Sequence, residues 1–341
     1  MAAESNHKFR PAAWRWGALC LAALLAGSIC GCKPKEPPAE NPWVSPRQAQ
    51  KNLPACPEGG TELTYRLQDT VRTGLSGLRG VAFGPNGRLY AAGEGGVKVM
   101  QSGGELLAEW PTPAPATCVA VGEDGNAYVG LKTSVVVYDE SGEETERWDY
   151  EGKGGGRFSY VKGIAVAGVN VFVADAGNRC VHRFAADGDF IWAIGEREPG
   201  GENPGIICPS PYLDCVVGAN DKLYVTNPGR LRVETYDFSG DLIEFWGQSG
   251  LKPRQFIGCC NPTNVALLPD GRFVTAEKET PRVKVYSADG ELLSCMGPEN
   301  FSADAAGLDL ATDPDGRIYV ADPGSNDILV FVPAGGSGSD E

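Results

Sequence analysis

The chain has 341 residues, of which 42% are hydrophobic and 22% charged, and its formal net charge is −14 at pH 7. So acidic a chain repels the phosphate backbone, so we expect no nucleic-acid partner and no electrostatic attachment to anionic lipid. The only two histidines, His7 and His182, exclude enzymes that bind zinc through several imidazoles.

Residues 1–32 have the composition of a secretory signal. Lys8, Arg10 and Arg15 form a basic start, and an apolar run follows at 17–29. A helix of that length covers roughly 20 Å, less than the ~30 Å hydrocarbon core of a bilayer. The run ends in Ile-Cys-Gly-Cys, which resembles a bacterial lipobox with Cys32 as the acylated residue. We expect lipidation of Cys32; a cleaved signal without lipid and an uncleaved anchor are the alternatives.

Residues 33–60 are rich in Pro, Lys, Glu, Asn and Gln and have no periodic apolar pattern. Such a composition is typical of a tether stiffened by proline. Together with a lipid on Cys32, it predicts an exported protein that is anchored to a bacterial membrane, on its periplasmic or cell-surface side.

Six copies of one pattern run through residues 76–333, within a predicted domain at 61–333. Each copy begins with an apolar strand, a turn rich in Gly, Asn or Asp, and a second strand, as in GPNGRLYAAG (84–93) and DPDGRIYVAD (313–322). A third strand follows, for example RVKVY (282–286), and then a Gly turn and a strand that ends in an aromatic residue or Met. Four strands repeated six times predict an all-β, six-bladed β-propeller with antiparallel blades.

The sixth copy lacks its fourth strand, because residues 334–341 form a polar Gly/Ser tail that we expect to be flexible. The segment 61–70 (TELTYRLQDT) precedes the first copy and alternates apolar with polar residues. Pairing this segment into the last blade closes the ring and removes two exposed sheet edges. We therefore predict that an N-terminal strand completes the sixth blade.

The phrase GIAVAGVNVFVADAGNRCVHRF (163–184), echoed by LDLATDPDGRIYVADPGSNDILVF (308–331), resembles the NHL repeat, and the resemblance covers about four fifths of the chain. It implies a six-bladed propeller. NHL-type and related propellers include peptide-amidating lyases, lactonases, RNA-binding proteins and scaffolds, so the resemblance leaves the function open. A lyase mechanism that relies on histidine-bound zinc lacks its ligands in this chain.

Eight of the eleven cysteines lie beyond Cys32, and an even number in an exported chain permits disulfides. Cys208, Cys259 and Cys260 come just before the first strands of blades 4 and 5, in loops that cross between blades. We expect these three to lie near one another at the mouth of the channel. Cys295, in an outer strand, is expected to be a small buried residue, as is Cys180.

The least generic stretch is FIGCCNPTN (256–264). A disulfide from Cys208 to Cys259 or Cys260 would join neighbouring blades, and its removal would cost about 2–5 kcal/mol. The thiolates could instead bind copper, zinc or an iron cluster. A redox-active pair is the third interpretation, and it needs a basic neighbour such as Lys278.

Four polar residues end the second strands of their blades: Asp175, Asn227, Glu277 and Asp322. For Asp175 and Asp322 we expect turn capping, since Asp bonds readily to the backbone two residues on. Glu caps turns poorly, so Glu277 and its neighbour Lys278 join the three cysteines as candidate ligand-binding or redox residues.

The first strands are expected to line the channel. Equivalent positions, seven residues before each first turn with allowance for a short turn in blade 3, are Gly80, Cys118, Gly163, Asp214, Asn264 and Asp309. Asp214, Asn264 and Asp309 offer oxygen ligands from three consecutive blades to a hard cation such as Ca²⁺. The alternative is that these groups hold channel water or bond to free strand-end amides.

These observations favour a non-enzymatic propeller that is tethered to a membrane and presents its upper face to a protein or a small ligand. One alternative is a metal-binding or thiol-redox module at the GCCNP loop, working with an electron-transfer partner. The other is a calcium-dependent enzyme resembling lactonases or hydrolases, in which a channel carboxylate has to serve as the base.

Overall fold

The computed structural model describes Cys56 and residues 63–149, 158–196, 205–218, 221–303 and 305–334, all of which belong to the unit Pro46–Glu341. The predicted signal, its lipidation site Cys32 and most of the tether and tail lie outside these residues and stay predictions. In the described part of the chain, no helix is long and apolar enough to cross a membrane.

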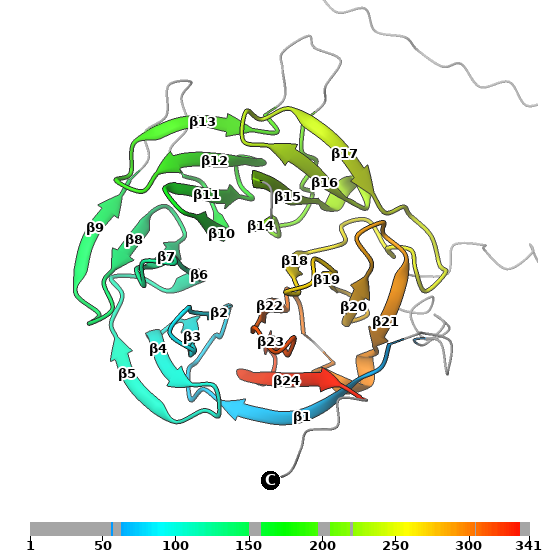
Figure 1. Cartoon of the computed structure of the whole chain (residues 1–341), viewed down its shortest axis with the longest axis horizontal. Helices are drawn as coiled ribbons and strands as arrows, with labels where there is room; N and C mark the ends of the chain where they lie inside the picture. The colour runs from blue at the N-terminus through cyan, green and yellow to red at the C-terminus, as the bar shows by residue number, and fades with distance from the viewer. Residues whose placement is uncertain are drawn as a thin grey trace, which may run out of the picture. The chain divides into compact units, whose positions relative to one another are not determined.

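The described residues form six four-stranded antiparallel sheets arranged around an axis, a six-bladed β-propeller as predicted (Figure 1). Blade 1 consists of β2 (Gly80–Phe83), β3 (Arg88–Gly93), β4 (Gly96–Gln101) and β5 (Leu106–Trp110). Blade 2 consists of β6 (Ala116–Val121), β7 (Ala127–Leu131), β8 (Val135–Tyr138) and β9 (Glu144–Trp148). Blade 3 consists of β10 (Val161–Ala167), β11 (Asn170–Asp175), β12 (Cys180–Ala185) and β13 (Phe190–Ile194).

Blade 4 consists of β14 (Cys215–Gly218), β15 (Lys222–Asn227), β16 (Arg232–Asp237) and β17 (Leu242–Trp246). Blade 5 consists of β18 (Asn264–Leu267), β19 (Phe273–Glu277), β20 (Arg282–Tyr286) and β21 (Leu292–Met296). Blade 6 consists of β22 (Asp309–Thr312), β23 (Ile318–Asp322), β24 (Asp327–Pro333) and β1 (Tyr65–Arg72). Two short 3-10 turns are η2 (Pro228–Arg230) and η3 (Pro298–Asn300). We call the face where the first strand of each blade begins the upper face; the loops between blades lie on it.

An N-terminal strand closes the ring, as predicted. β1 pairs antiparallel with β24 from Tyr65 opposite Pro333 to Arg72 opposite Asp327, so the first and last strands lie side by side in blade 6 (Figure 1). The strand begins at Tyr65 and ends at Arg72, slightly later than the predicted 61–70. Just before it, the backbone N–H of Leu63 donates to the carbonyl of Leu293 in blade 5, at 3.2 Å.

Aromatic side chains hold neighbouring blades together. The last residue of a fourth strand packs on the third strand of the next blade, with ring centroids 5.8, 5.4 and 4.9 Å apart in Trp110–Tyr138, Trp148–Phe184 and Trp246–Tyr286. Gly142 shows how tight this packing is: its φ is +86°, and a Cβ there would lie 2.1 Å from Nε1 of Trp110. The repeat thus specifies the contact between blades as well as each blade.

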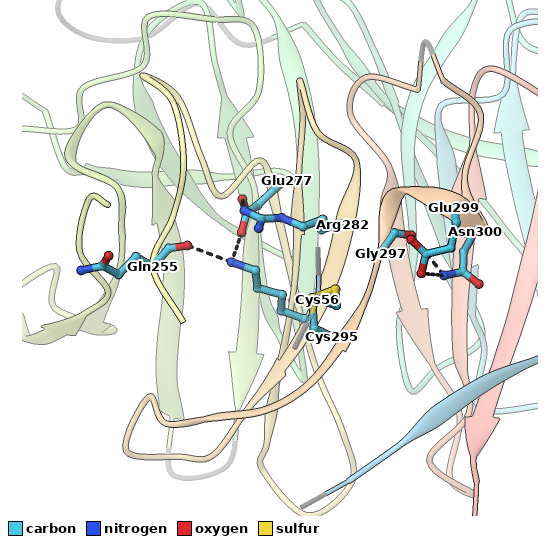
Figure 2. Close-up of a disulfide and its surroundings, with 9 residues drawn as sticks. Cys56, Gln255, Glu277, Arg282, Cys295, Gly297, Glu299 and Asn300 are labelled. Atoms are coloured by element: carbon cyan, nitrogen blue, oxygen red, sulfur yellow. Dashed lines mark hydrogen bonds and ion pairs between the residues drawn. A yellow bond between two sulfur atoms is a disulfide. The ribbon is translucent and has the colours of Figure 1, made fainter. Parts of the chain in front are cut away.

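The disulfide differs from the predicted one. Cys56 is bonded to Cys295 on β21 (Figure 2). Cys208, Cys259 and Cys260 are free thiols. The predicted bond from Cys208 to Cys259 or Cys260 of the segment FIGCCNPTN (256–264), called the GCC loop below, is therefore wrong. The interpretation of Cys295 as an unpaired buried residue is wrong as well. The physical reason is that Cys56 and Leu63 both contact the outer strand of blade 5, which brings Cys56 to Cys295 before β1 enters blade 6. These contacts cannot be read from the composition of the tether.

Candidate functional site at the upper mouth of the channel

The predicted ring of channel positions has the same register in all six blades. Five members lie opposite a small residue of the second strand, in the pairs Gly80–Ala92, Cys118–Gly130, Gly163–Ala174, Asn264–Ala276 and Asp309–Ala321. For the sixth member, Asp214, the carbonyl accepts from the backbone N–H of Thr226 at 3.0 Å. The alignment of the repeats is thereby confirmed, including the allowance for the short turn in blade 3.

A cavity of about 210 Å³ runs between the first strands. Four ring residues contribute to its wall, namely Cys118, Gly163, Asp214 and Asp309. Residues further along the same strands are mostly apolar, for example Val121 and Leu267, so polar groups concentrate at the upper end. Gly163 leaves room for its neighbour, because a Cβ there would lie 2.2 Å from Oδ1 of Asp214.

The two channel carboxylates bond to strand-end amides of other blades. Asp214 Oδ2 accepts from the backbone N–H of Val265 at 3.0 Å, which links blade 4 to blade 5. Asp309 Oδ2 accepts from the backbone N–H of Val81 at 2.8 Å, and Asp309 Oδ1 accepts from Nδ2 of Asn264 at 2.8 Å. These bonds connect blades 5, 6 and 1 across the mouth of the channel, so the two aspartates link neighbouring blades by hydrogen bonds.

Burial makes these carboxylates weak acids. The pKa of Asp214 is raised, first by burial and then by the charge of Asp309. Burial also raises the pKa of Asp309, against the opposing effect of Lys162. A proton held on this pair at neutral pH reduces its negative charge. The carboxyl groups then neutralise the cations at the mouth less completely.

The structure brings Asn264 and Asp309 into contact, and the calcium site itself stays a prediction. Three of the oxygens that would be ligands, Oδ2 of Asp214 and both oxygens of Asp309, accept from amides instead. Within the described ranges, no group of three or more His, Cys, Asp or Glu residues is arranged to hold a metal ion. The bonds match the alternative interpretation, in which the polar groups of the ring satisfy strand ends.

Cations gather above this ring, around Tyr212. The ammonium groups of Lys162 and Lys278 lie 5.9 and 5.7 Å from the centroid of the Tyr212 ring, within the range of cation–π attraction. Lys162 is 6% exposed, and within the described part of the chain its Nζ donates a single long bond of 3.4 Å, to the carbonyl of Thr117. Among the described residues, neither lysine has a carboxylate oxygen within 4.0 Å.

A second, smaller cavity of about 50 Å³ adjoins these groups. Its wall includes Arg79, Tyr160, Lys162 and Tyr212. Arg79 and Lys162 each come one residue before a ring position. The alignment of the repeats could therefore have predicted that both residues lie at the mouth of the channel. Tyr212 has no such signal, because it belongs to an irregular loop between blades 3 and 4.

The GCC loop lies close to the same mouth. Cys259 is exposed and Cys260 is buried, and their sulfur atoms are 2.7 Å apart. The Cys208 thiol donates to the carbonyls of Ser210 at 2.8 Å and Tyr212 at 3.1 Å. Burial raises the pKa of Cys208 to about 11, and the nearby Cys260 acts in the same direction. The structure therefore places Cys208 and the Cys pair in one region, as predicted, although they are not bonded.

Glu277 is not a ligand-binding residue at this mouth. Its carboxylate is 1% exposed and forms ion pairs with Arg282 and Lys284 inside blade 5 (Figure 2). Its predicted partner Lys278 does face the mouth, so the structure separates two residues that are adjacent in sequence. The cause is the alternation of side chains at the end of β19, which sends one inward and leaves the other on the loop.

The other three residues that end second strands hold the loop arriving from the preceding blade. Asp175 accepts from the backbone N–H of Tyr160 at 2.9 Å, Asp322 from that of Ser302 at 2.7 Å, and Asn227 from that of Ile207 at 3.1 Å. The predicted turn capping is confirmed as well, since Asp175 and Asp322 also accept from the N–H two residues on, at 3.0 and 2.8 Å.

In blade 5 the loop supplies this contact itself. Asn261 Oδ1 accepts from the backbone N–H of Lys278 at 2.9 Å, and Asn261 Nδ2 donates to the carbonyl of Ile257 at 2.6 Å. Position 277 is thereby released from holding the loop. This explains why a Glu occupies it and why Lys278 is fixed next to the cysteines.

Blade 3 contains a buried Cys-His-Asp group that the sequence pattern does not single out. His182 Nε2 lies 3.5 Å from the sulfur of Cys180 and 3.8 Å from Asp175 Oδ2. Both contacts use the same ring nitrogen, so the histidine cannot relay a proton between the two. Burial raises the pKa of Cys180 far above its usual range, which leaves the thiol protonated and unreactive.

No family model matches this chain, and neither does any curated protein sequence. Solved structures do match: a streptogramin B lyase (TM-score 0.56, 11% identity, covering 79% of this chain and 98% of the lyase) and virginiamycin B lyase from Staphylococcus aureus (0.54, 12%, 79% and 99%). A chain of the mitotic checkpoint complex also matches (0.55, 12%, 78% and 93%). At such identities the likeness shows the fold alone, a β-propeller that serves lyases and assemblies alike.

Proposed function

We propose that this chain is a non-enzymatic binding propeller that takes a small carboxylate at the upper mouth of its channel. The observation that carries the proposal is Tyr212 placed between the ammonium groups of Lys162 and Lys278. Although the chain has a net charge of −14, these two cations meet at one aromatic ring, and neither has a carboxylate oxygen within 4.0 Å in the described structure. Beside a concave surface, they favour an anion as ligand.

The ring below the cations supports a second contact with the ligand. The amide oxygen of Asn264 is buried and accepts no hydrogen bond in the described structure. A buried acceptor of this kind gains free energy when a donor reaches it. A carboxylate that also carries a hydroxyl or an amide N–H offers an anion to the lysines and a hydrogen-bond donor to the amide oxygen of Asn264.

The proposal is tested by thermal unfolding in the presence of acetate, lactate or N-acetylglycine at constant ionic strength. A ligand at 100 times its Kd stabilises the native state by about 2.7 kcal/mol, so at least lactate or N-acetylglycine should raise the Tm. We expect Lys162→Met and Lys278→Met to lose this increase. Lys222→Met is the matched control, since Lys222 begins β15 at the lower turn of blade 4.

An equal rise in Tm for the wild type and both mouth variants would contradict the proposal, as would no rise with any of the three compounds. A calcium-dependent hydrolase is the weaker candidate, because the carboxylates of the ring already bind amides.

We also propose that the protein is exported and anchored by a lipid on Cys32. The sequence of the first 32 residues supports this, and so does the bond between Cys56 and Cys295, because disulfides persist in oxidising compartments. The ligand site would then face the space outside the cytoplasm.

For the anchor, we expect Cys32→Ser to abolish incorporation of a labelled fatty acid in a bacterial host and to move the protein out of the membrane fraction. Several acyl chains on one residue hold a protein firmly to a membrane. Without acyl chains, an acidic protein has no electrostatic attraction to the bilayer. Cys30→Ser should keep the label. Fatty-acid labelling of Cys32→Ser at the wild-type level would refute the anchor.

A further inference from the structure

The two adjacent cysteines of the GCC loop are held in contact by a tight turn. The side chain of Asn261 reaches back to the carbonyl of Ile257 at 2.6 Å and accepts from the backbone N–H of Lys278 at 2.9 Å. Both cysteines lie between these anchor points. Gly258 allows the turn, since its φ is +84°.

The contact between the sulfurs is too short for unrelated side chains. Sγ of Cys259 and Sγ of Cys260 are 2.7 Å apart, compared with about 2.05 Å in a disulfide. Neighbouring side chains in an extended segment point to opposite sides, so the turn is what brings these two together. A small displacement separates this pair from a bond.

The two sulfurs differ in access. Cys259 is exposed on the upper face, whereas Cys260 is only 3% exposed and lies beneath it. This is the arrangement of an attacking thiol with a resolving thiol behind it. The third thiol nearby, Cys208, is engaged with the carbonyls of Ser210 and Tyr212.

We propose that Cys259 and Cys260 form a redox-active vicinal pair that exchanges with small-molecule disulfides. The thiolate of Cys259 attacks one sulfur of the disulfide R–S–S–R; that S–S bond breaks, and one thiolate leaves and takes up the proton given up by Cys259. Cys260 then gives up its proton and attacks the Cys259 sulfur of the mixed disulfide, which releases the second thiol. Two protein thiols are oxidised to one disulfide, and R–S–S–R is reduced to two R–SH.

Charges on the facing loop set the rate of this exchange. The pKa of Cys259 is raised, first by its hydrogen bond with Cys260, then by burial and by the charges of Cys260 and Glu279, while Lys278 lowers it. Exchange therefore accelerates with rising pH, because more of the thiol is ionised. Glu279→Gln removes one of the opposing charges and should raise the rate at a fixed pH several-fold.

The experiment treats the reduced, desalted chain with oxidised glutathione and maps its peptides by mass spectrometry. We expect the peptide with both cysteines to lose two hydrogens, with release of two equivalents of glutathione beyond the two that re-forming the Cys56–Cys295 bond releases. Cys260→Ser should stop at a glutathione adduct on Cys259, and Cys259→Ser should not react at this loop. Cys208→Ser should behave as the wild type.

A wild-type protein that accumulates the glutathione adduct, or that pairs Cys259 with Cys208, would overturn the proposal, as would an unreactive Cys259. The Tm of each serine variant shows that it is folded, so a lost reaction reports on the thiol. The outcome does not depend on carboxylate binding, since glutathione release is read separately.

Discussion

Glu277→Gln should lower the free energy of unfolding by about 3–5 kcal/mol, the usual cost of leaving a buried charge without its partner. The Glu277 carboxylate lies between Arg282 and Lys284, and none of the three residues is more than 1% exposed. The substitution keeps the shape of the side chain but leaves two cations buried in the blade. Denaturant unfolding monitored by tryptophan fluorescence measures the loss.

The matched control replaces the whole ion group. A triple variant with Glu277→Leu, Arg282→Met and Lys284→Met removes the charges together, and such replacements are often neutral or stabilising by about 1–4 kcal/mol. We expect the triple variant to be more stable than Glu277→Gln. A triple variant that is less stable than the single one would show that the ion group is itself a net source of stability.

The free energy of unfolding should also depend on pH, because Lys284 titrates at a different pH in the folded and unfolded chain. Burial lowers the pKa of Lys284 to about 8, whereas an unfolded lysine titrates near 10.4. Between these values the unfolded chain binds more protons, so this group makes the protein more stable as the pH rises through the window. The loss caused by Glu277→Gln should therefore be smaller at pH 9 than at pH 7, because Lys284 can then lose its charge.

The ion group also anchors the loop that carries the cysteine pair. Lys284 Nζ donates to the carbonyl of Gln255 at 2.9 Å (Figure 2). The hydroxyl of Tyr286 donates to the carbonyl of Arg254 at 3.2 Å. Hydrogen exchange in the loop between β17 and β18 should rise in Glu277→Gln more than exchange in blade 2. The stability of blade 5 and the geometry of the candidate redox site are thus linked.

Cys56→Ser or Cys295→Ser should lower the free energy of unfolding by about 2–5 kcal/mol. The two cysteines are 239 residues apart in sequence, so the bond restricts nearly the whole unfolded propeller. In the folded state it holds Cys56 on β21, nine residues before the start of β1, the strand that closes the ring. The measurement is denaturant unfolding with and without reductant.

The double variant Cys56→Ser/Cys295→Ser should match each single variant, because one bond is lost in all three. Reductant should destabilise the wild type to the same level and leave the three variants unchanged. Hydrogen exchange should increase first along β1. An unaltered unfolding curve for the reduced wild type would contradict the predicted role of the bond.

The repeat pattern alone was enough to predict the propeller. Its blade number, its four strands per blade and the closure by an N-terminal strand follow from alternating apolar residues and turn glycines, which act within one blade. The ring from Gly80 to Asp309 was predicted for the same reason, since equivalent positions of a repeat occupy equivalent places. The capping roles of Asp175 and Asp322 also depend only on residues two places away.

What meets across blades was decided by the tertiary structure. Cys56, which lies in a stretch of sequence without the repeat pattern, pairs with Cys295 of blade 5. Glu277 turns inward because Asn261 holds the loop in its place. Lys162, Tyr212 and Lys278 come from three different blades or loops and meet only when the ring closes. Local patterning determines strands and turns, whereas a site formed by loops depends on long-range packing that no single repeat encodes.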